Sequence, residues 1–494
     1  AMQPIMSALC KSGLARSSEL LKRLHTSKAS FLATNSPSTP NPSKNPDTAR
    51  TWKAHVRLGA MKRSVNSGSQ LQNFAVVGPF DIENYGDHLF EHILLQQIDE
   101  KFPGSRVDVF SVYGGPHGFN KDGLQVFSID SLGELCSEKD YSAIFIAGGS
   151  VIHFHTLVQD VRGVMKKYPM WKLWTTASYA ASTYAIPLLW NSPEAPFEFK
   201  GWEKLAAKSF VQTVDYLSVR DEASRNSLLD LGASTPIVND DSGMLFASFA
   251  AKNNLAEYLP EELDTNDTRP IAVFHCNQNF DTDDMNPLLA TLRKVGETFR
   301  VVLLPLAYTN REQDMLHMIY KSSNESFVFI NRTLTFNEIC SIFVACKLYM
   351  GLSFHGAIST YCSGGEIVAF DYEKRRKTEQ LYERLGKRSN YTNDIGAFND
   401  AVERCLSHGT PPPSPATHDI EANLHKHFEK MLSHIYSEKA KEPHDISTVY
   451  SAVLFEMAER VRAETAIQSL SEGYAECYRQ YTELRKQLNP DAGD

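Results

Sequence analysis

Two kinds of hydrophobic pattern alternate along the first half of the chain. An apolar, β-branched run at 71–80 (LQNFAVVGPF) is followed at 88–102 by apolar positions three and four residues apart. The first pattern predicts a buried strand and the second an amphipathic helix. Further short apolar runs, separated by helical patterns, lie at 106–114, 141–155, 185–192, 215–221 and 236–240. Strands that alternate with helices in this way predict a doubly wound parallel sheet.

The same alternation restarts after a polar, proline-containing stretch at 250–268. Strands are predicted at 269–277, 300–308, 349–353 and 366–372, and helices at 285–299 and 337–347. We therefore predict an α/β fold of two Rossmann-like parallel-sheet domains in tandem. Because ligands bind at the carboxyl ends of parallel strands, a functional cleft is expected between the two domains.

The two ends of the chain depart from this pattern. The start is basic, Ser-rich and Pro-rich, which indicates a disordered extension or an organelle transit peptide. Near the other end, apolar residues alternate spacings of three and four, which suits a homo-oligomer or packing on the same chain: Ile467, Leu470, Tyr474, Cys477, Tyr481, Leu484 and Leu488. The predicted divisions are a basic extension 1–70, a first domain 71–249, a linker 250–268, a second domain 269–414 and a helical tail 415–494.

Composition narrows the functional classes. The chain is 42% hydrophobic and 22% charged, as in ordinary globular proteins, and no apolar run is long enough to span a membrane. The net charge of the whole chain is −9, but the first 70 residues carry +9, so the remainder carries −18. Such an acidic body argues against nucleic-acid binding. Eight cysteines without a CxxC pair indicate buried free thiols in a reducing compartment. We expect a cytoplasmic protein or, through the basic start, an organelle protein.

One histidine lies at a predicted strand end above the cleft. His355 follows the strand 349–353 and precedes the helical stretch GAISTYCSG, so it is either an acid/base group or an ordinary turn residue. Ser353 and the first helical N–H groups are candidate anion donors. Arg220, in SVRD, either clamps a phosphate or carboxylate or forms a surface pair with Asp221.

Acidic residues lie at two other predicted strand–helix junctions. Gly86 permits a tight turn, and Asp87 is expected to cap the helix beside it. Asp240 and Asp241 follow a predicted strand, where they either accept hydrogen bonds from sugar hydroxyls or cap a helix.

The segment AGGSVIHFH raises the question of a metal. Gly148 and Gly149 would let the backbone approach a ligand closely. His153 and His155 lie two residues apart, but no third ligand has a suitable spacing. We therefore expect no metal site.

The order of these motifs resembles the polysaccharide pyruvyl transferase family. The resemblance rests on ENYGDHL (83–89), YSAIFIAGGSVI (141–152), YLSVRDEAS (216–224), IVNDDSG (237–243), LTFNEICSIFVACKLYMGLSFHGAI (334–358) and GGEIVAFDYEKR (364–375). It implies a GT-B-like fold, phosphoenolpyruvate as co-substrate without a further cofactor, and a saccharide acceptor that receives pyruvate as a ketal. Alternatives are a nucleotide-sugar glycosyltransferase of the same layout and a repurposed binding or scaffolding member of the family.

The resemblance also assigns roles to residues. His355 would be the acid/base group and Arg220 the anion clamp, while Ser353 stands where many members have an arginine. The remaining donor contacts would be Gly356, Lys374, Arg375, Gly148 and Gly149, and the acceptor contacts Asn84, Gly86, Asp87 and Asp240.

Overall fold

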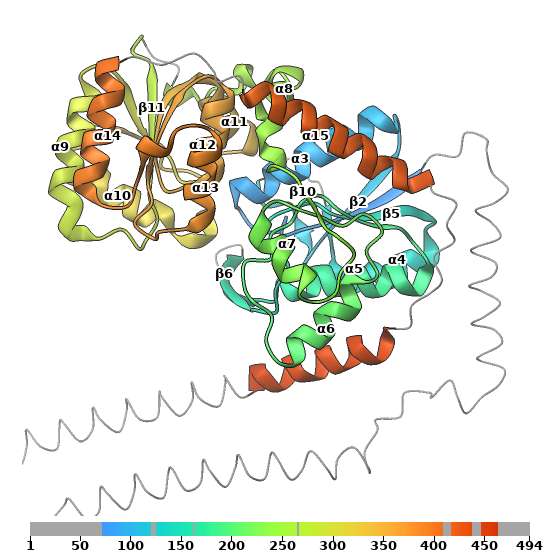
Figure 1. Cartoon of the computed structure of the whole chain (residues 1–494). Coiled ribbons are helices and arrows are strands. Elements are labelled where there is room, and N and C mark those ends of the chain that lie inside the picture. Colours follow the sequence, from blue (N-terminus) through green and yellow to red (C-terminus); the bar gives the residue numbers. More distant parts are fainter. Residues whose placement is uncertain are drawn as a thin grey trace, which may run out of the picture. The chain divides into compact units, whose positions relative to one another are not determined.

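A computed structural model describes residues 72–119, 125–161, 164–263, 266–408, 416–436 and 446–462. The predicted basic extension 1–70 and the heptad pattern at 467–488 lie outside the described residues. Figure 1 shows two α/β lobes, the first in blue to green and the second in yellow to orange.

The first lobe is built on a six-stranded sheet within the described residues. In spatial order its strands are β3 (Gly115–Pro116), β4 (Gln125–Ser128), β2 (Arg106–Ser111), β1 (Asn73–Val77), β5 (Tyr141–Ile146) and β8 (Leu188–Trp190). Every pair is parallel except β3 with β4. Because the chain order reverses between β1 and β5, the carboxyl ends of these two strands mark the ligand-binding crevice of a doubly wound sheet.

Short strands continue the chain beyond β8. Leu189 and Tyr216 form a parallel bridge, and β9 (Ser218–Val219) then pairs in parallel with β10 (Ile237–Val238). An antiparallel hairpin of β6 (Leu157–Val161) and β7 (Val164–Tyr168) lies between β5 and β8 in the sequence.

Helices enclose the first sheet because its central strand is apolar on both sides. In β1, Phe74 and Val76 belong to one buried cluster and Ala75 and Val77 to another, as expected when successive side chains point to opposite faces. The helices of this lobe are α3 (Tyr85–Lys101), α4 (Leu132–Glu138), α5 (Trp171–Tyr184), α6 (Trp202–Val211), α7 (Glu222–Leu229) and α8 (Phe246–Lys252), with 3-10 turns η2 (Ile129–Ser131) and η3 (Ser242–Leu245).

The second lobe has a six-stranded, fully parallel sheet within the described residues. In spatial order its strands are β13 (Val328–Phe329), β12 (Arg300–Leu303), β11 (Ile271–His275), β14 (Cys346–Gly351), β15 (Glu366–Phe370) and β16 (Tyr391–Thr392). This is the Rossmann order, with the reversal between β11 and β14. His355 comes directly after β14, so it lies at that reversal.

Helices flank this sheet too. They are α9 (Met285–Gly296), α10 (Glu312–Ser322), α11 (Phe336–Ala345), α12 (Phe354–Cys362), α13 (Arg376–Arg384) and α14 (Ile395–His408), with 3-10 turns η6 (Thr282–Asp284), η7 (Tyr308–Asn310) and η8 (Arg388–Asn390). The predicted α/β fold of two Rossmann-like parallel sheets, the GT-B-like arrangement, is confirmed.

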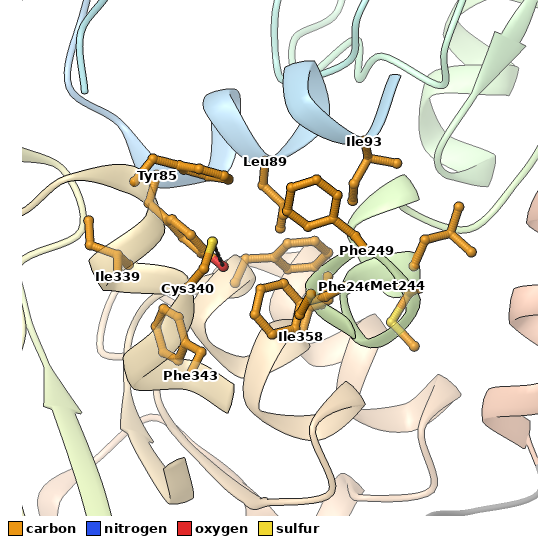
Figure 2. Close-up of a cluster of buried hydrophobic side chains, with 14 of the residues drawn as sticks. Tyr85, Leu89, Ile93, Met244, Phe246, Phe249, Ile339, Cys340, Phe343 and Ile358 are labelled. Carbon is orange, nitrogen blue, oxygen red and sulfur yellow. Dashed lines mark hydrogen bonds between the residues drawn. The ribbon is translucent and has the colours of Figure 1, made fainter. Parts of the chain in front are cut away.

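One hydrophobic cluster, here called the shared core, includes residues of both lobes. Figure 2 shows Tyr85, Leu89 and Ile93 of α3 beside side chains of η3, α8, α11 and α12. The phenol of Tyr85 is hydrogen-bonded to the Ser359 hydroxyl of α12 at 2.7 Å. Its ring lies 5.2 Å from the ring of Phe343. The lobes are therefore joined by core packing as well as by the chain.

The polar stretch predicted as a linker contributes to the same core. After α8 the chain forms η4 (Leu255–Tyr258) and η5 (Glu261–Leu263), and Leu255 and Leu263 are buried in the shared core. The exact domain boundaries remain predictions.

Helices follow the second lobe, as predicted for the region after 415. Helix α15 (Ala416–Ser433), followed by η9 (His434–Tyr436), packs on α3 and η3. Residues 447–462 are also helical, and Tyr450 stacks on Tyr179 of α5 with ring centroids 4.5 Å apart. Among the described helices, none has the length and apolar character needed to cross a bilayer. Cys276, Cys340 and Cys346 are buried free thiols, as predicted, whereas the free thiols Cys362 and Cys405 are half-buried.

Candidate functional site

His355 lies in the first turn of α12 because Ser353 caps that helix. The Ser353 hydroxyl accepts a hydrogen bond from the Gly356 N–H at 3.2 Å. The backbone N–H of Ser353 donates to the phenol of Tyr349 at 2.8 Å. The predicted strand, turn and helix around His355 are confirmed. Ser353 thus has a structural role at this turn, in addition to the donor role expected from the sequence.

The imidazole of His355 contacts both lobes. Its ring is perpendicular to the Phe90 ring of α3, with the ring centroids 4.9 Å apart. Its Nε2 lies 3.5 Å from Oδ2 of Asp241. That separation is longer than a usual hydrogen bond, and Nε2 has no hydrogen-bond partner among the described residues. Burial lowers the pKa of His355, although Asp241 opposes the shift. The resting ring is therefore neutral at pH 7 and able to accept a proton.

Asp241 links His355 to an arginine of the first lobe. Its Oδ1 accepts a hydrogen bond from the Gly243 N–H at 2.9 Å, which caps η3, and its Oδ2 lies 3.5 Å from Arg220. Burial alone would raise the pKa of Asp241, but His355 and Arg220 together lower it. Asp241 is therefore an anion between the His355 imidazole and the Arg220 guanidinium, and it both caps a helix and belongs to the site.

Arg220 follows β9 and is almost fully buried. Its guanidinium donates to the Ser150 hydroxyl at 3.1 Å and to the Glu194 carboxylate, and it lies over the Phe354 ring at 5.4 Å. Its Nε–H has no partner among the described residues. Asp221 caps α7 by accepting from the Ser224 N–H, so the alternative of a surface pair is wrong.

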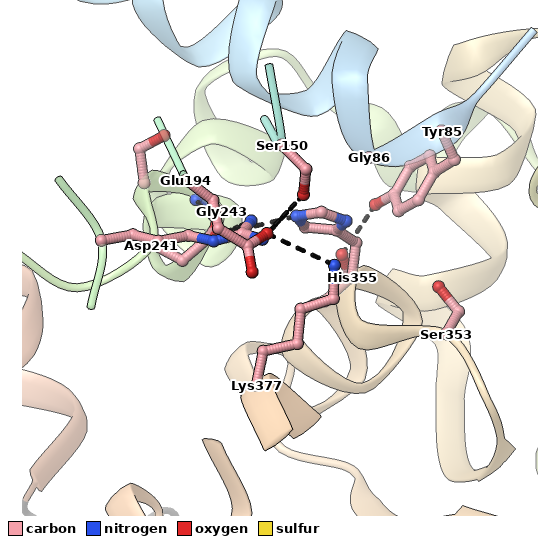
Figure 3. Close-up of polar contacts among 12 residues, drawn as sticks. Tyr85, Gly86, Ser150, Glu194, Asp241, Gly243, Ser353, His355 and Lys377 are labelled. Atoms are coloured by element: carbon pink, nitrogen blue, oxygen red, sulfur yellow. Dashed lines mark hydrogen bonds and ion pairs between the residues drawn. The ribbon is translucent and has the colours of Figure 1, made fainter. Parts of the chain in front are cut away.

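Lys377 of α13 brings a second cation to the same place. Its Nζ lies 3.6 Å from the Glu194 carboxylate and 5.9 Å from the centre of the Phe354 ring. Burial, with the nearby charges of Arg220 and Arg375, lowers the pKa of Lys377 to about 7. Figure 3 shows His355 and Lys377 pointing from the second lobe toward Asp241, Glu194 and Ser150 of the first.

The start of α3 forms another wall of this cluster. Helix α3 begins at Tyr85, and its cap is Asn84, which accepts from the Gly86 N–H at 3.1 Å; the expected capping role of Asp87 is wrong. Burial raises the pKa of Asp87 to about 7, while Lys377 and Arg220 oppose the shift. Asp87 thus faces the same two cations.

Two glycines after β5 let the backbone approach these side chains. A Cβ at Gly149 would lie 2.9 Å from the Asp87 carboxylate, and one at Gly148 would lie 2.9 Å from the Phe90 ring. Both have positive φ, +81° and +132°, so the sharp turn here favours glycine.

The sequence model of polysaccharide pyruvyl transferases matches residues 84–374, more than half of the chain. The chain belongs to the polysaccharide pyruvyl transferase family. The matched region begins at the Asn84 cap of α3 and includes His355, Arg220 and Asp241, while Lys377 lies three residues beyond its end.

Solved structures with a similar chain path include sugar-nucleotide enzymes. A UDP-GlcNAc 2-epimerase from Neisseria meningitidis, bound to UDP-GlcNAc, is 10% identical over 79% of this chain and 100% of its own, with a TM-score of 0.45. The Rickettsia bellii UDP-N-acetylglucosamine 2-epimerase is 11% identical over 74% and 97%, with a TM-score of 0.47. Anabaena HepE, in complex with UDP-glucose, is 12% identical over 78% and 99%, with a TM-score of 0.42. The comparison with curated proteins found no match.

Not every residue assigned by the family resemblance lies in the cluster. Asp240 forms a bidentate ion pair with Arg384, with both contacts at 3.1 Å. Lys374 is exposed in a turn with φ of +54°. Arg375 contacts Asp371 and the Leu352 carbonyl, directly before Ser353. The roles of these residues in binding remain predictions.

Gly356 serves packing in this structure. A Cβ there would lie 2.7 Å from the Tyr349 ring, and its N–H is already bonded to Ser353. His153 and His155 do not converge on a shared ligand position either, since Nδ1 of His153 accepts from the His155 backbone at 3.0 Å.

Sequence reasoning missed three members of the cluster. Ser150 directly follows the glycine pair, and Glu194 lies in an irregular segment after β8 where no pattern marks it. Lys377 belongs to the basic run EKRRK (373–377) after β15, three residues after Lys374, to which the resemblance assigned a donor contact. This run of basic residues was the sequence signal that could have identified Lys377.

Proposed function

We propose that this protein is a transferase that moves the pyruvyl group of phosphoenolpyruvate to two hydroxyls of a saccharide, forming a ketal. The observation that carries the proposal is the cluster in which His355 and Asp241 lie beside the cations Arg220 and Lys377. The family match over 84–374 supports the same reaction class.

The two cations suit a substrate with two anionic groups. Phosphoenolpyruvate carries a carboxylate and a phosphate, which Arg and Lys recognise through charge-assisted hydrogen bonds. The free Nε–H of Arg220 and the ammonium of Lys377 are the donors available to it. Glu194 now contacts both cations, so the substrate would compete with this carboxylate.

His355 is assigned the proton transfers. In the reaction, the methylene carbon of phosphoenolpyruvate gains a proton and the neighbouring carbon is attacked by a sugar hydroxyl. The C–O bond to phosphate then breaks, and a second hydroxyl closes the ketal. The two hydroxyl protons end on the new methyl group and on phosphate. A neutral His355 next to the Asp241 carboxylate is suited to accept a proton from a hydroxyl, because the carboxylate stabilises the imidazolium.

The acceptor is assigned to the α3 side of the cluster. The Asp87 carboxyl accepts or donates hydrogen bonds there, as sugar hydroxyls require. Asn84 and Gly86 shape the same turn.

Ligand-dependent melting separates the candidate functions. We expect millimolar phosphoenolpyruvate to raise the Tm of the protein by several degrees, and Arg220→Met to abolish the rise. With a saccharide acceptor, proton NMR should show a new ketal methyl signal that is absent in His355→Gln. Stabilisation by UDP-glucose but not by phosphoenolpyruvate would favour a glycosyltransferase. No response to either ligand would overturn both assignments and favour a binding or scaffolding role.

A further inference from the structure

A second polar cluster lies on another face of α3, apart from the candidate active site. His88 and Glu91 are one helical turn apart on α3, and His117 follows β3. All three side chains are buried, with at most 1% of their surface exposed. The two imidazoles and the carboxylate converge, and their facing atoms all lie within 4.8 Å of one another.

The hydrogen bond of His88 to the backbone determines its tautomer. Its Nε2 lies 2.7 Å from the Ile82 carbonyl, which can only accept, so Nε2 carries the proton. A fully buried imidazole favours its neutral form, which leaves a lone pair on Nδ1. This arrangement, with one ring nitrogen donating to a backbone carbonyl, is the one that orients metal-binding histidines.

The lone pair of His88 faces other acceptors. Its Nδ1 lies 3.3 Å from Oε2 of Glu91 and 3.2 Å from Nε2 of His117. His117 can place one proton between itself and Glu91, where the separation is 2.6 Å, but no proton remains for His88. The second carboxylate oxygen of Glu91 is buried and has no hydrogen-bond partner among the described residues. The cluster therefore has one negative charge and a surplus of lone pairs, which a cation would satisfy.

The spacing of the three atoms is close to that of a metal site. Ligands of a tetrahedral zinc ion at its usual bond lengths lie about 3.3 Å apart. Two of the three separations, 3.2 and 3.3 Å, already have this value. The third, 2.6 Å, would lengthen when an ion replaces the proton between His117 and Glu91.

We propose that His88, Glu91 and His117 bind a divalent transition-metal ion of the zinc class. Two imidazoles and one carboxylate are a ligand set that such ions prefer over calcium or magnesium. Gly118 supports the arrangement, because a Cβ there would lie 2.3 Å from the Ile82 oxygen and 2.9 Å from His88 Nε2. Only a residue without a side chain leaves room for the bond between His88 and Ile82.

A cavity of about 380 Å³ lies next to the cluster and offers an entry path. His117 lines it, together with Ile82, Glu83 and Gly118 of the first lobe and Tyr308 and Thr309 of the second. A water molecule from this cavity is the natural fourth ligand. The proposal does not depend on the pyruvyl transfer reaction, and it replaces the expectation of no metal site, which rested on His153 and His155.

Metal content of the purified full chain tests the proposal. After equilibration with Zn²⁺ and removal of free ion, we expect about one zinc per chain by mass spectrometry. Glu91→Gln and His117→Gln should each lose at least nine-tenths of it. His92→Gln is the matched control on the same helix and should retain the zinc. The His92 ring stacks on Phe336 at 4.2 Å and lies 6.0 Å from the His117 ring, but it is not one of the three converging groups. A chelator should lower the Tm of the wild type but not that of Glu91→Gln.

A measurement on the wild type alone guards against variants that fail to fold. Co²⁺ bound to this site should give the visible absorption of a tetrahedral complex at one equivalent, and Zn²⁺ should remove it. A wild type that binds neither ion stoichiometrically would overturn the proposal. Equal metal content in the wild type and Glu91→Gln would overturn it too.

Discussion

Gly86 of α3 makes room for the imidazole of His355. A Cβ at Gly86 would lie 2.1 Å from Nδ1 of His355 and 2.6 Å from its Cε1. The ring therefore rests directly on the backbone of the first lobe, although it belongs to the second.

Gly86→Ala should displace His355 without unfolding the protein. Alanine is favourable in a helix, so the substitution should act through the ring and lower kcat at least tenfold. The matched control is Gly133→Ala in α4, where a Cβ would meet nothing within 4 Å. That variant should keep full activity and gain about 0.5–1 kcal/mol of stability. Equal activity of the two variants in a ketal-formation assay would contradict the assigned position of His355.

The charge of Lys377 should control the pH dependence of donor binding. Its pKa is lowered to about 7, so the free enzyme loses this positive charge as the pH rises above 7. We expect kcat/KM for phosphoenolpyruvate to fall between pH 7 and 9, a range in which the substrate phosphate is already fully ionised. Lys377→Arg keeps the charge and should remove most of this decline, leaving the part that comes from ionisation of Asp87, whose pKa is also about 7. Lys374→Arg, at an exposed position, should leave it unchanged.

The lowered pKa of Lys377 also makes the stability of the protein depend on pH. Because the folded-state pKa of Lys377 is below that of the unfolded chain, the unfolded state binds more protons between about pH 7 and 10. The contribution of Lys377 to stability therefore rises with pH across this window. Urea unfolding at pH 7 and 9 should show a larger increase for the wild type than for Lys377→Met.

Glu194 should weaken anion binding, because its carboxylate contacts both Arg220 and Lys377 and competes with the substrate for them. Glu194→Gln keeps hydrogen-bond acceptance from Ser150 and Arg220 but removes the charge. We expect the Kd for inorganic phosphate or phosphoenolpyruvate to decrease about tenfold, which calorimetry can measure. Glu198→Gln is the control, since Glu198 is exposed and pairs only loosely with Lys200 at 3.7 Å. Unchanged or weaker binding by Glu194→Gln would show that the anion binds elsewhere.

The hydrogen bond between Tyr85 and Ser359 should couple the stability of the two lobes. Tyr85→Phe and Ser359→Ala should each lower the free energy of unfolding by about 1 kcal/mol, and the double variant by little more than either alone. Urea titrations followed by tryptophan fluorescence can complete this cycle. Additive effects would mean that the two hydroxyls do not interact in solution.

The sequence predicted the elements whose pattern is local. The apolar run ending at Ser353 and the helical stretch after it together placed His355 at a strand end, and the structure agrees. The SVRD motif placed Arg220 in the same way. Such positions follow from hydrophobic periodicity and capping chemistry, which neighbouring residues determine.

The local sequence did not predict which of two adjacent side chains faces the site, or which distant residues meet in the folded chain. Asp240 and Asp241 are adjacent, and side chains alternate direction in extended backbone, so a one-residue shift decides which carboxylate meets His355. Lys377 required knowing that α13 begins at Arg376. His117 lies 26 residues from Glu91, and only the folded chain brings their side chains together.

The shared core limits how this protein can handle its substrates. In many two-lobed enzymes the domains rotate about a hinge, and each opening exposes the surfaces that face the cleft. Here an opening of that kind would pull Leu89 and Ile93 of α3 away from Phe343, Ile358 and other second-lobe residues of the shared core, exposing apolar side chains to water. The lobes should behave as a rigid frame, so the speed of substrate entry would be set by surface loops and side chains such as Glu194 rather than by domain motion.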